Sequence, residues 1–197
     1  MDPRTRALRE VSKHCDIEER LTLVPPSAVT RGLYFRSLEA RLAHAGQSDR
    51  YHSLFPQRYA ALGWYPTRDY LERVTIAAGM LRSPEHVHEG LFELARDNAR
   101  AFTDGVLGQL LIRFLARDPM QLLKQGLAGR RQSAKPARWE LSFPDERTAV
   151  MHLIEEYLYI ESYELGAAHG TFEAAGLSVR IECQLEDRFV GKHIVRW

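Results

Sequence analysis

The sequence predicts an α+β domain in which an N-terminal helical layer packs on a C-terminal four-strand antiparallel sheet with one crossing helix. Apolar residues recur at helical spacing before Gly129 and alternate with polar residues after it. A long segment of the last third is rich in small residues, which is typical of a helix that packs closely. Two alternating segments joined at Glu186-Asp187 then end the chain as a hairpin. We expect strands near 138–143, 147–154, 177–186 and 188–196, and a helix over 155–175.

Caps and prolines divide the first two thirds of the chain into helices. Ser83-Pro84 and Asp118-Pro119 each combine an N-cap side chain with a proline that suits the first helical turn. Gly46 and Gly176 stand where a helix is expected to end in a left-handed conformation. The expected helices cover 4–13, 31–45, 67–81, 84–103, 106–115 and a short stretch from 119 to 127.

Two connecting segments separate these elements. Residues 47–66 carry too many aromatics for a free linker, and we expect them to cover part of the core, with a helix near 56–62. Residues 129–137 read as a polar, basic loop. We assign residues 1–30 to an N-terminal extension or helix and 31–197 to a single α+β domain of ligand-binding type, although the length also allows two small domains.

Composition narrows the class of protein. The chain has 197 residues, 45% of them hydrophobic, and a net charge of +1, so no global field favours nucleic acid or an anionic membrane. No apolar run reaches the roughly 18 residues of a membrane span, and residues 1–20 lack the apolar core of a signal peptide. The two cysteines, Cys15 and Cys183, are far apart, so a disulfide framework is not expected and a cytoplasmic location fits best.

Seven sequence blocks resemble a paralogous family of unknown function found in myxobacteria. Together they cover nearly the whole chain. The blocks are RGLYFRSLEARL (31–42), SPEHVHEG (83–90), NARAF (98–102), LLIRFLARDP (110–119), GRRQSAKPARWE (129–140), ESYELGAAHGTFEAAG (161–176) and EDRFVGKHIVRW (186–197).

A second resemblance concerns the fold. Residues 164–195 are similar to the end of 4-vinyl-reductase-type ligand-binding domains, which share a fold with haem–nitric-oxide sensor domains and with subunits of the transport protein particle. The resemblance implies helices packed on a four-strand antiparallel sheet, with a pocket between the layers. Gly166, Gly170 and Gly176 match the small positions of the last helix and its exit. Because glycine lets a backbone approach closely, we expect Gly166 and Gly170 to lie at a tight helix contact.

Haem is the first ligand that this fold suggests. The haem-binding members hold propionates with a Tyr-x-Ser-x-Arg motif and ligate iron through a histidine on a nearby helix. The nearest match here runs from Tyr51 through Ser53 to Phe55, and Phe55 replaces the arginine. We therefore predict no haem and no other cofactor.

Metal and catalytic sites are not supported by the motifs. His86 and Glu89 are spaced to share a helix face, but the paired Cys/His spacings of a structural zinc site are absent. Glu161 and Glu164 could share a face as catalytic carboxylates do, yet a glutamate-rich helix is usually a solvated surface. Nucleophile-elbow, phosphate-loop and dinucleotide-binding motifs are missing. We predict that the chain is not an enzyme.

Basic residues offer an alternative site. Arg130, Arg131 and Arg138 cluster with Lys135 around the loop at 129–137 and could bind a phosphate or a carboxylate, or could simply be solvated. No aromatic ladder accompanies them, so single-stranded nucleic acid is not suggested.

The function that we expect is a sensory or regulatory domain that binds a small, mainly apolar ligand between helices and sheet. A dimeric protein-interaction scaffold, like the transport-particle subunits, is the alternative. An apolar pocket uses few polar anchors, and we name Arg96, Arg113 and His169 as candidates. The expected apolar contacts, which could equally be core residues, are Leu91, Leu111, Leu115, Trp139, Leu141 and Phe143.

Overall fold

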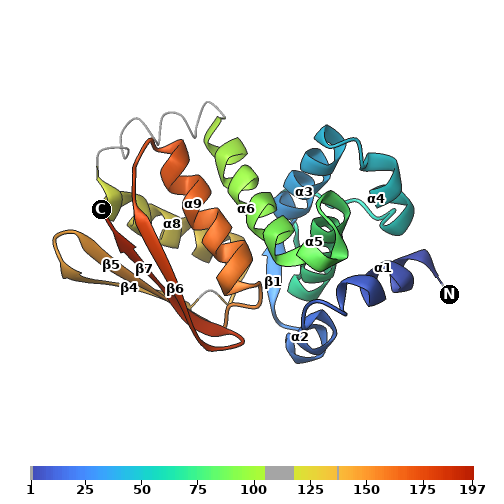
Figure 1. Ribbon diagram of the computed structural model, residues 1–197, viewed down its shortest axis with the longest axis horizontal. Coiled ribbons are helices and arrows are strands. Elements are labelled where there is room, and N and C mark those ends of the chain that lie inside the picture. The colour runs from blue at the N-terminus through green and yellow to red at the C-terminus, as the bar shows by residue number, and fades with distance from the viewer. Residues whose placement is uncertain (1, 105–117, 137) are drawn as a thin grey trace. The chain divides into compact units, whose positions relative to one another are not determined.

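The computed structural model describes residues 2–104, 118–136 and 138–197, and it divides into two compact units, Met1–Leu94 and Ala95–Trp197 (Figure 1). The predicted helix at 106–115 lies outside the described residues. Among the helices that the structure does describe, none is both long and apolar enough to cross a membrane. The α+β class predicted from the sequence is confirmed.

The first unit is mainly helical. Its helix α1 begins at Pro3, one residue before the predicted start, because the Asp2 side chain accepts a hydrogen bond from the Thr5 amide and Pro3 occupies the first turn. Two short strands pair antiparallel, with Thr30 opposite Tyr65. The elements are α1 (Pro3–Val11), α2 (Ile17–Leu23), β1 (Val29–Arg31), α3 (Gly32–His44), α4 (Ser48–Leu54), β2 (Trp64–Pro66), α5 (Thr67–Leu81), η1 (Pro84–His86) and the start of α6 (Val87–Asp104).

The aromatic segment at 47–66 does cover part of the core, since Tyr51, Phe55 and Tyr59 are buried. The helix predicted near 56–62 is wrong, because residues 55–60 form no regular element and a turn follows at 61–62. α4 ends at Leu54, since a residue that precedes proline, here Phe55 before Pro56, is disfavoured in the helical region. Gly46 has φ of 69°, which confirms the expected left-handed end of α3.

The second unit contains a four-strand antiparallel sheet in the order β4-β5-β7-β6. Its elements, after the end of α6, are α8 (Pro119–Ser133), β3 (Ala134–Lys135), β4 (Arg138–Asp145), β5 (Thr148–Ile154), η2 (Ile160–Glu164), α9 (Leu165–Ala174), β6 (Arg180–Asp187) and β7 (Val190–Arg196). All four predicted strands are confirmed, with ends that differ by up to three residues.

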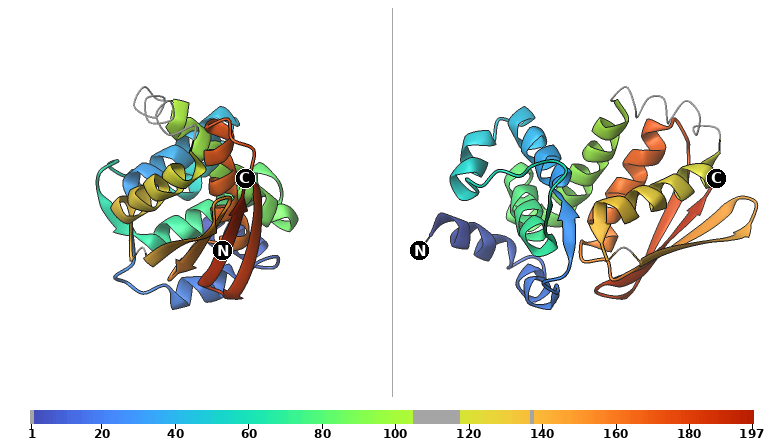
Figure 2. Two further views of the ribbon diagram at one scale, coloured as in Figure 1. Left: turned by 90° about the vertical axis from the view of Figure 1, so that its left-hand side faces the viewer. Right: turned by 180° about the vertical axis from the view of Figure 1, so that it is seen from behind.

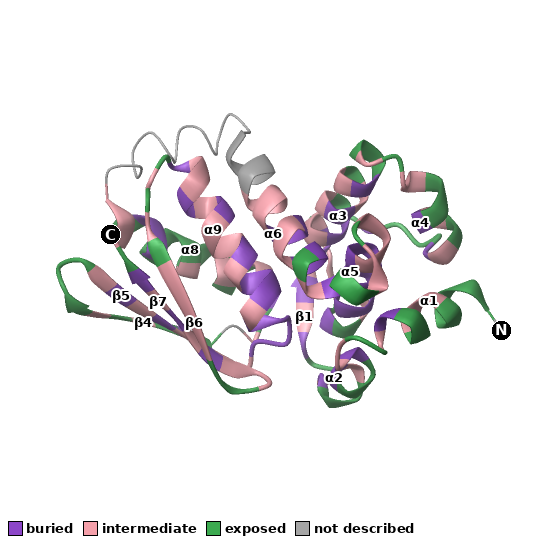
Figure 3. Ribbon diagram, viewed as in Figure 1, coloured by how far each residue is buried: buried purple, intermediate pink, exposed green. Residues whose placement is uncertain are grey.

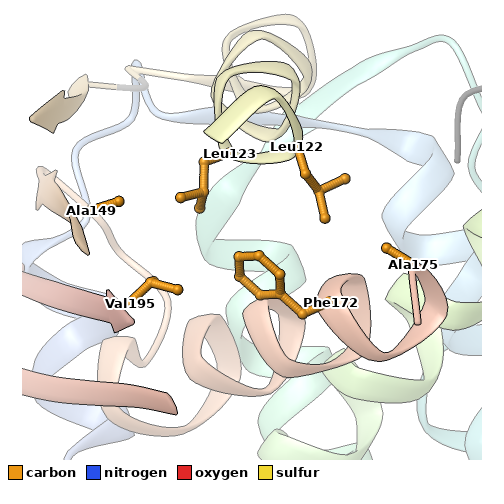
Figure 4. Packing of buried hydrophobic residues seen from close by; sticks show 6 residues of the cluster. All are labelled: Leu122, Leu123, Ala149, Phe172, Ala175 and Val195. Atoms are coloured by element: carbon orange, nitrogen blue, oxygen red, sulfur yellow. The ribbon is translucent and has the colours of Figure 1, made fainter. Parts of the chain in front are cut away.

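Helices α8 and α9 both pack on one face of this sheet (Figure 2). Figure 3 shows buried residues along β5, β7 and the length of α9. At one end of the layer the space is filled by an apolar cluster, in which Phe172 of α9 lies between the leucines of α8 and the sheet (Figure 4). The buried members of the cluster are Leu122, Leu123, Ala149, Phe172, Ala175 and Val195.

The segment predicted as one helix over 155–175 is shorter in the structure. Glu155 has φ of 55°, and the Glu156 amide donates to the Phe189 carbonyl at 3.1 Å, so the chain is irregular rather than helical until Ile160. A π-helical turn, η2, then leads into α9. Gly176 has φ of 68° and ends the helix as predicted.

The loop predicted at 129–137 is wrong in its first half, because α8 continues to Ser133. The Ser133 hydroxyl donates to the Gly129 carbonyl at 2.9 Å, which satisfies an acceptor in the last turn. Asp118 caps the start of α8 as predicted, with its side chain accepting from the amides of Met120 and Gln121.

Candidate functional site

A buried charge cluster lies in the second unit, where the end of α8 meets the π-helical turn. Arg130 comes from the last turn of α8, Glu156 from the irregular segment after β5, and Glu164 from the end of η2. The Arg130 Nη2 donates to Glu156 Oε2 at 2.5 Å and lies 3.5 Å from Glu164 Oε1. The three side chains are 9%, 2% and 5% exposed, so water screens their interactions little.

Glu156 is held by donors on several sides. Besides Arg130, the indole Nε1 of Trp139 donates to Oε2 at 3.0 Å and the Leu158 amide donates to Oε1 at 3.1 Å. The Arg130 guanidinium also lies 5.0 Å from the centre of the Trp139 ring. A buried carboxylate with one cation and three hydrogen bonds is compensated, so Glu156 acts as the anion that keeps Arg130 in place.

Glu164 is in a different state. Burial and, after it, the nearby Glu156 raise the pKa of its carboxyl to about 8, although Arg130 opposes the rise. Its Oε1 is buried and accepts no hydrogen bond, since 3.5 Å from Arg130 is too long for one. At neutral pH Glu164 is therefore mostly a neutral acid, which offers an O–H donor and a vacant acceptor inside the unit.

The other end of the same π-helical turn contacts a buried histidine. His193 lies on the inner face of β7, between Met151 and Cys183 of the neighbouring strands. Its Nε2 donates to the Ile160 carbonyl at 3.1 Å, while its Nδ1 is buried and makes no hydrogen bond. Burial lowers the pKa of His193 to about 4, so the ring is neutral. Two neutral, titratable side chains, Glu164 and His193, therefore lie at the two ends of the π-helical turn, and each has a buried atom that makes no hydrogen bond.

The predicted ligand contacts fall in several places. Trp139 belongs to the charge cluster, and Leu141 and Phe143 pack against the apolar cluster of Figure 4. Leu91 is buried in the first unit. Leu111, Arg113 and Leu115 lie outside the described residues.

Two predicted anchors are on helices. Arg96 donates from Nε to Glu173 Oε2 at 2.8 Å, which ties α6 to α9 within the second unit. His169 is half-buried on α9, and burial lowers its pKa. Between these helices Gly170 lies so close to the Arg96 backbone that an added Cβ would stand 2.9 Å from its carbonyl carbon, which confirms the predicted tight contact. Gly166 is buried.

The predicted anion-binding arginines also have partners in the structure. Arg130 faces the two buried glutamates, and Arg131 Nη2 donates to the Trp139 carbonyl at 3.4 Å. Arg138 lies 3.7 Å from Glu155 at the surface. The charge of Arg130 is therefore directed into the unit rather than toward a solvent anion.

Sequence reasoning missed Glu156 and His193. Glu156 was assigned to a solvated helix, yet the pair Glu155-Glu156 stands between the apolar strand 148–154 and the run Tyr157-Leu158-Tyr159-Ile160. Charges flanked by apolar residues on both sides are a signal that one of them is buried, although the sequence does not tell which. His193 occupies an inward position of an alternating strand, which is a similar signal.

A metal site is not found in the part of the chain that the structure describes, where no three His, Cys, Asp or Glu side chains are grouped to hold an ion. His86 and Glu89, which the sequence placed on one face, do meet, with Nδ1 and Oε1 3.0 Å apart, but both are exposed.

Solved structures that resemble this chain define the class of fold. An Fe(II) unliganded H-NOX protein mutant from K. algicida matches with a TM-score of 0.64 and 16% identity, over 84% of this chain and 95% of that chain. A structure described as probing heme distortion in the H-NOX family matches with a TM-score of 0.60 and 14% identity, over 84% and 93%. A mutant of T. tengcongensis H-NOX matches with a TM-score of 0.57 and 15% identity, over 83% and 93%. The chain therefore has an H-NOX-like fold.

Its family follows from a sequence comparison. Residues 23–197 match the model described as a protein of unknown function, DUF2378, and the chain belongs to that family. None of the curated proteins compared with the chain matches it.

The residues present do not fit a haem held as the sequence analysis describes. The sequence has no Tyr-x-Ser-x-Arg motif and no histidine between His88 and His152. In its nearest match, Tyr51 and Phe55 are at most 1% exposed in the core of the first unit. The buried His193 uses Nε2 for the Ile160 carbonyl. We therefore derive no haem chemistry for this chain.

Proposed function

We propose that this chain is a non-enzymatic sensory domain that binds a small, mainly apolar ligand between the helices and sheet of its second unit, with Glu164 as the polar anchor. One observation carries the proposal: a buried acid whose pKa is about 8 and whose Oε1 accepts no hydrogen bond. Ligand sites of this kind are lined mostly by apolar groups and use few polar ones for orientation. The H-NOX-like fold supports a sensory role by analogy, since function resides in the site rather than in the fold.

Ligand binding at Glu164 would affect the rest of the second unit by changing the ionisation of the Glu164 carboxyl. A ligand that accepts the Glu164 proton in a hydrogen bond keeps the acid neutral, whereas a cationic group favours its ionised form. Ionised Glu164 would compete with Glu156 for Arg130, which holds the end of α8. The signal is then a change in the position of α8.

Catalysis is not part of the proposal. Acid–base chemistry on two carboxylates requires that the second one be available to take a proton. Glu156 already accepts hydrogen bonds from Arg130, Trp139 and the Leu158 amide.

Native mass spectrometry of protein purified from its own host tests the proposal, because it reports a retained ligand and the number of subunits together. We expect a bound small molecule, and thermal-shift screening with fatty acids and haem to show stabilisation by apolar ligands only. Glu164→Gln should weaken that stabilisation, while Glu146→Gln in the exposed β4–β5 turn should not. A ligand-free dimer that no screened compound stabilises would contradict the proposal and favour the scaffold function.

A further inference from the structure

A second buried charge lies in the first unit, far in sequence from the cluster around Glu164. Arg73 belongs to α5 and is 5% exposed. Its guanidinium carbon lies 4.5 Å from the centre of the Phe55 ring, 4.8 Å from that of Tyr59 and 5.8 Å from that of Phe35. Aromatic faces attract a cation, so the three rings form a box that holds the guanidinium.

The guanidinium has no carboxylate partner among the described residues. Its Nη1 is buried and makes no hydrogen bond. The neighbouring acid, Glu72, is engaged by Arg4, whose Nε and Nη2 donate to its two oxygens at 2.6 and 2.5 Å. A buried arginine remains charged, and a buried charge without a counterion is strongly unfavourable. Ring contacts compensate such a charge only in part.

Two phenols adjoin this charge. Tyr51 is fully buried and Tyr59 is 6% exposed, and neither hydroxyl has a partner in hydrogen-bonding geometry. Burial raises the pKa of Tyr51 to about 12 and also raises that of Tyr59. Arg73 opposes both shifts, because it can donate a hydrogen bond to either phenolate and its charge lies close to both. Both phenols are therefore neutral donors. Glu39, which also raises the pKa of Tyr51, lies beyond ion-pair distance of Arg73 and leaves one buried oxygen without a hydrogen bond.

We infer that Arg73, Tyr51 and Tyr59 form a binding site for a small carboxylate anion in the first unit. One permanent cation and two phenolic O–H groups are all donors, and they match an acceptor-only group with a single negative charge. A carboxylate suits one guanidinium and two phenols better than phosphate does, because phosphate brings more negative charge and more acceptor oxygens than these three side chains can match. The near-complete burial of all three side chains limits the ligand, or its head group, to a small size. This site is independent of the function proposed for the second unit.

Titration calorimetry and thermal shift with sodium formate and sodium acetate test the inference, with sodium chloride at equal ionic strength as the reference. Wild type should bind formate or acetate and gain melting temperature over chloride. Tyr51→Phe and Tyr59→Phe keep the rings and the charge, and each should weaken binding by about tenfold, the order expected for one hydrogen bond to a charged group. Tyr34→Phe is the matched control and should bind as wild type does, because the Tyr34 ring packs edge to face against Tyr70 instead.

Arg73→Lys retains the charge but loses the planar donor set, and should abolish binding if it folds. The inference is overturned if wild type shows no difference between carboxylates and chloride. It is also overturned if both tyrosine variants bind as wild type does, or if inorganic phosphate binds more tightly than acetate.

Discussion

Gly170→Ala tests whether Gly170 lies at a tight contact. The substitution should lower the free energy of unfolding if it does, and raise it if the helix is exposed there. An added Cβ at Gly170 would stand 2.9 Å from both the carbonyl carbon and the Cα of Arg96, and still nearer to its carbonyl oxygen. These are backbone atoms of α6, so they cannot rotate away as a side chain could. Overpacking typically costs about 1–3 kcal/mol, and a Cβ this close to backbone atoms falls in the upper part of that range, about 2–3 kcal/mol. The substitution also stabilises the helix by up to about 1 kcal/mol, because alanine is a better helix former than glycine.

We therefore expect Gly170→Ala to lower the free energy of unfolding by about 1–2 kcal/mol, as the difference between those two effects. For a chain of this size that corresponds to a fall in melting temperature of about 2–8 °C. Urea unfolding and calorimetry measure both quantities. Gly126→Ala is the matched control, because Gly126 lies in α8 with nothing within 4 Å of an added Cβ, and it should stabilise the protein by about 0.5–1 kcal/mol. A Gly170→Ala protein at least as stable as wild type would refute the packing argument.

Two further predictions concern the buried charges. The raised pKa of Glu164 means that the folded state retains a proton that the unfolded state loses above the ordinary pKa of 4.5, so stability should fall as pH rises toward 8. The pKa of His193 is lowered to about 4, so its contribution makes stability rise with pH. That rise ends near pH 6.5, the ordinary pKa of histidine. Between pH 6.5 and 8 urea unfolding should therefore show a decline of up to about 1.4 kcal/mol per pH unit that Glu164→Gln abolishes, and an unchanged slope in that variant would contradict the assignment. Arg130→Met should destabilise by about 3–5 kcal/mol, because Glu156 is left buried without its cation. Arg147→Met in the exposed turn between β4 and β5 should change stability by less than about 0.5 kcal/mol, and equal losses in the two variants would show that the ion pair is not the cause.

The sequence by itself determined the strands and several helix ends. Alternation along 138–143 specifies which side chains face the core, because a strand turns successive residues to opposite faces whatever lies beside it. Asp118-Pro119 and Gly176 act within one helical turn, so their effects can also be read locally. The α+β class follows from these local signals and their order along the chain.

Only the tertiary structure decided where the buried charges lie and what state they take. Arg130, Glu156 and Glu164 span 34 residues, and their pKa values depend on burial and on distances through space, which sequence spacing does not give. The sequence did not predict the left-handed backbone conformation of Glu155, which delays the start of the helix. Glutamate favours a helix, and here the tertiary structure overrides that propensity. Arg73 reads as an ordinary charged position on α5, and only the folding of Tyr51, Phe55 and Tyr59 around it leaves a guanidinium enclosed by rings without a counterion. Periodicity and caps are short-range properties of the chain, whereas desolvation and charge pairing arise when distant segments meet.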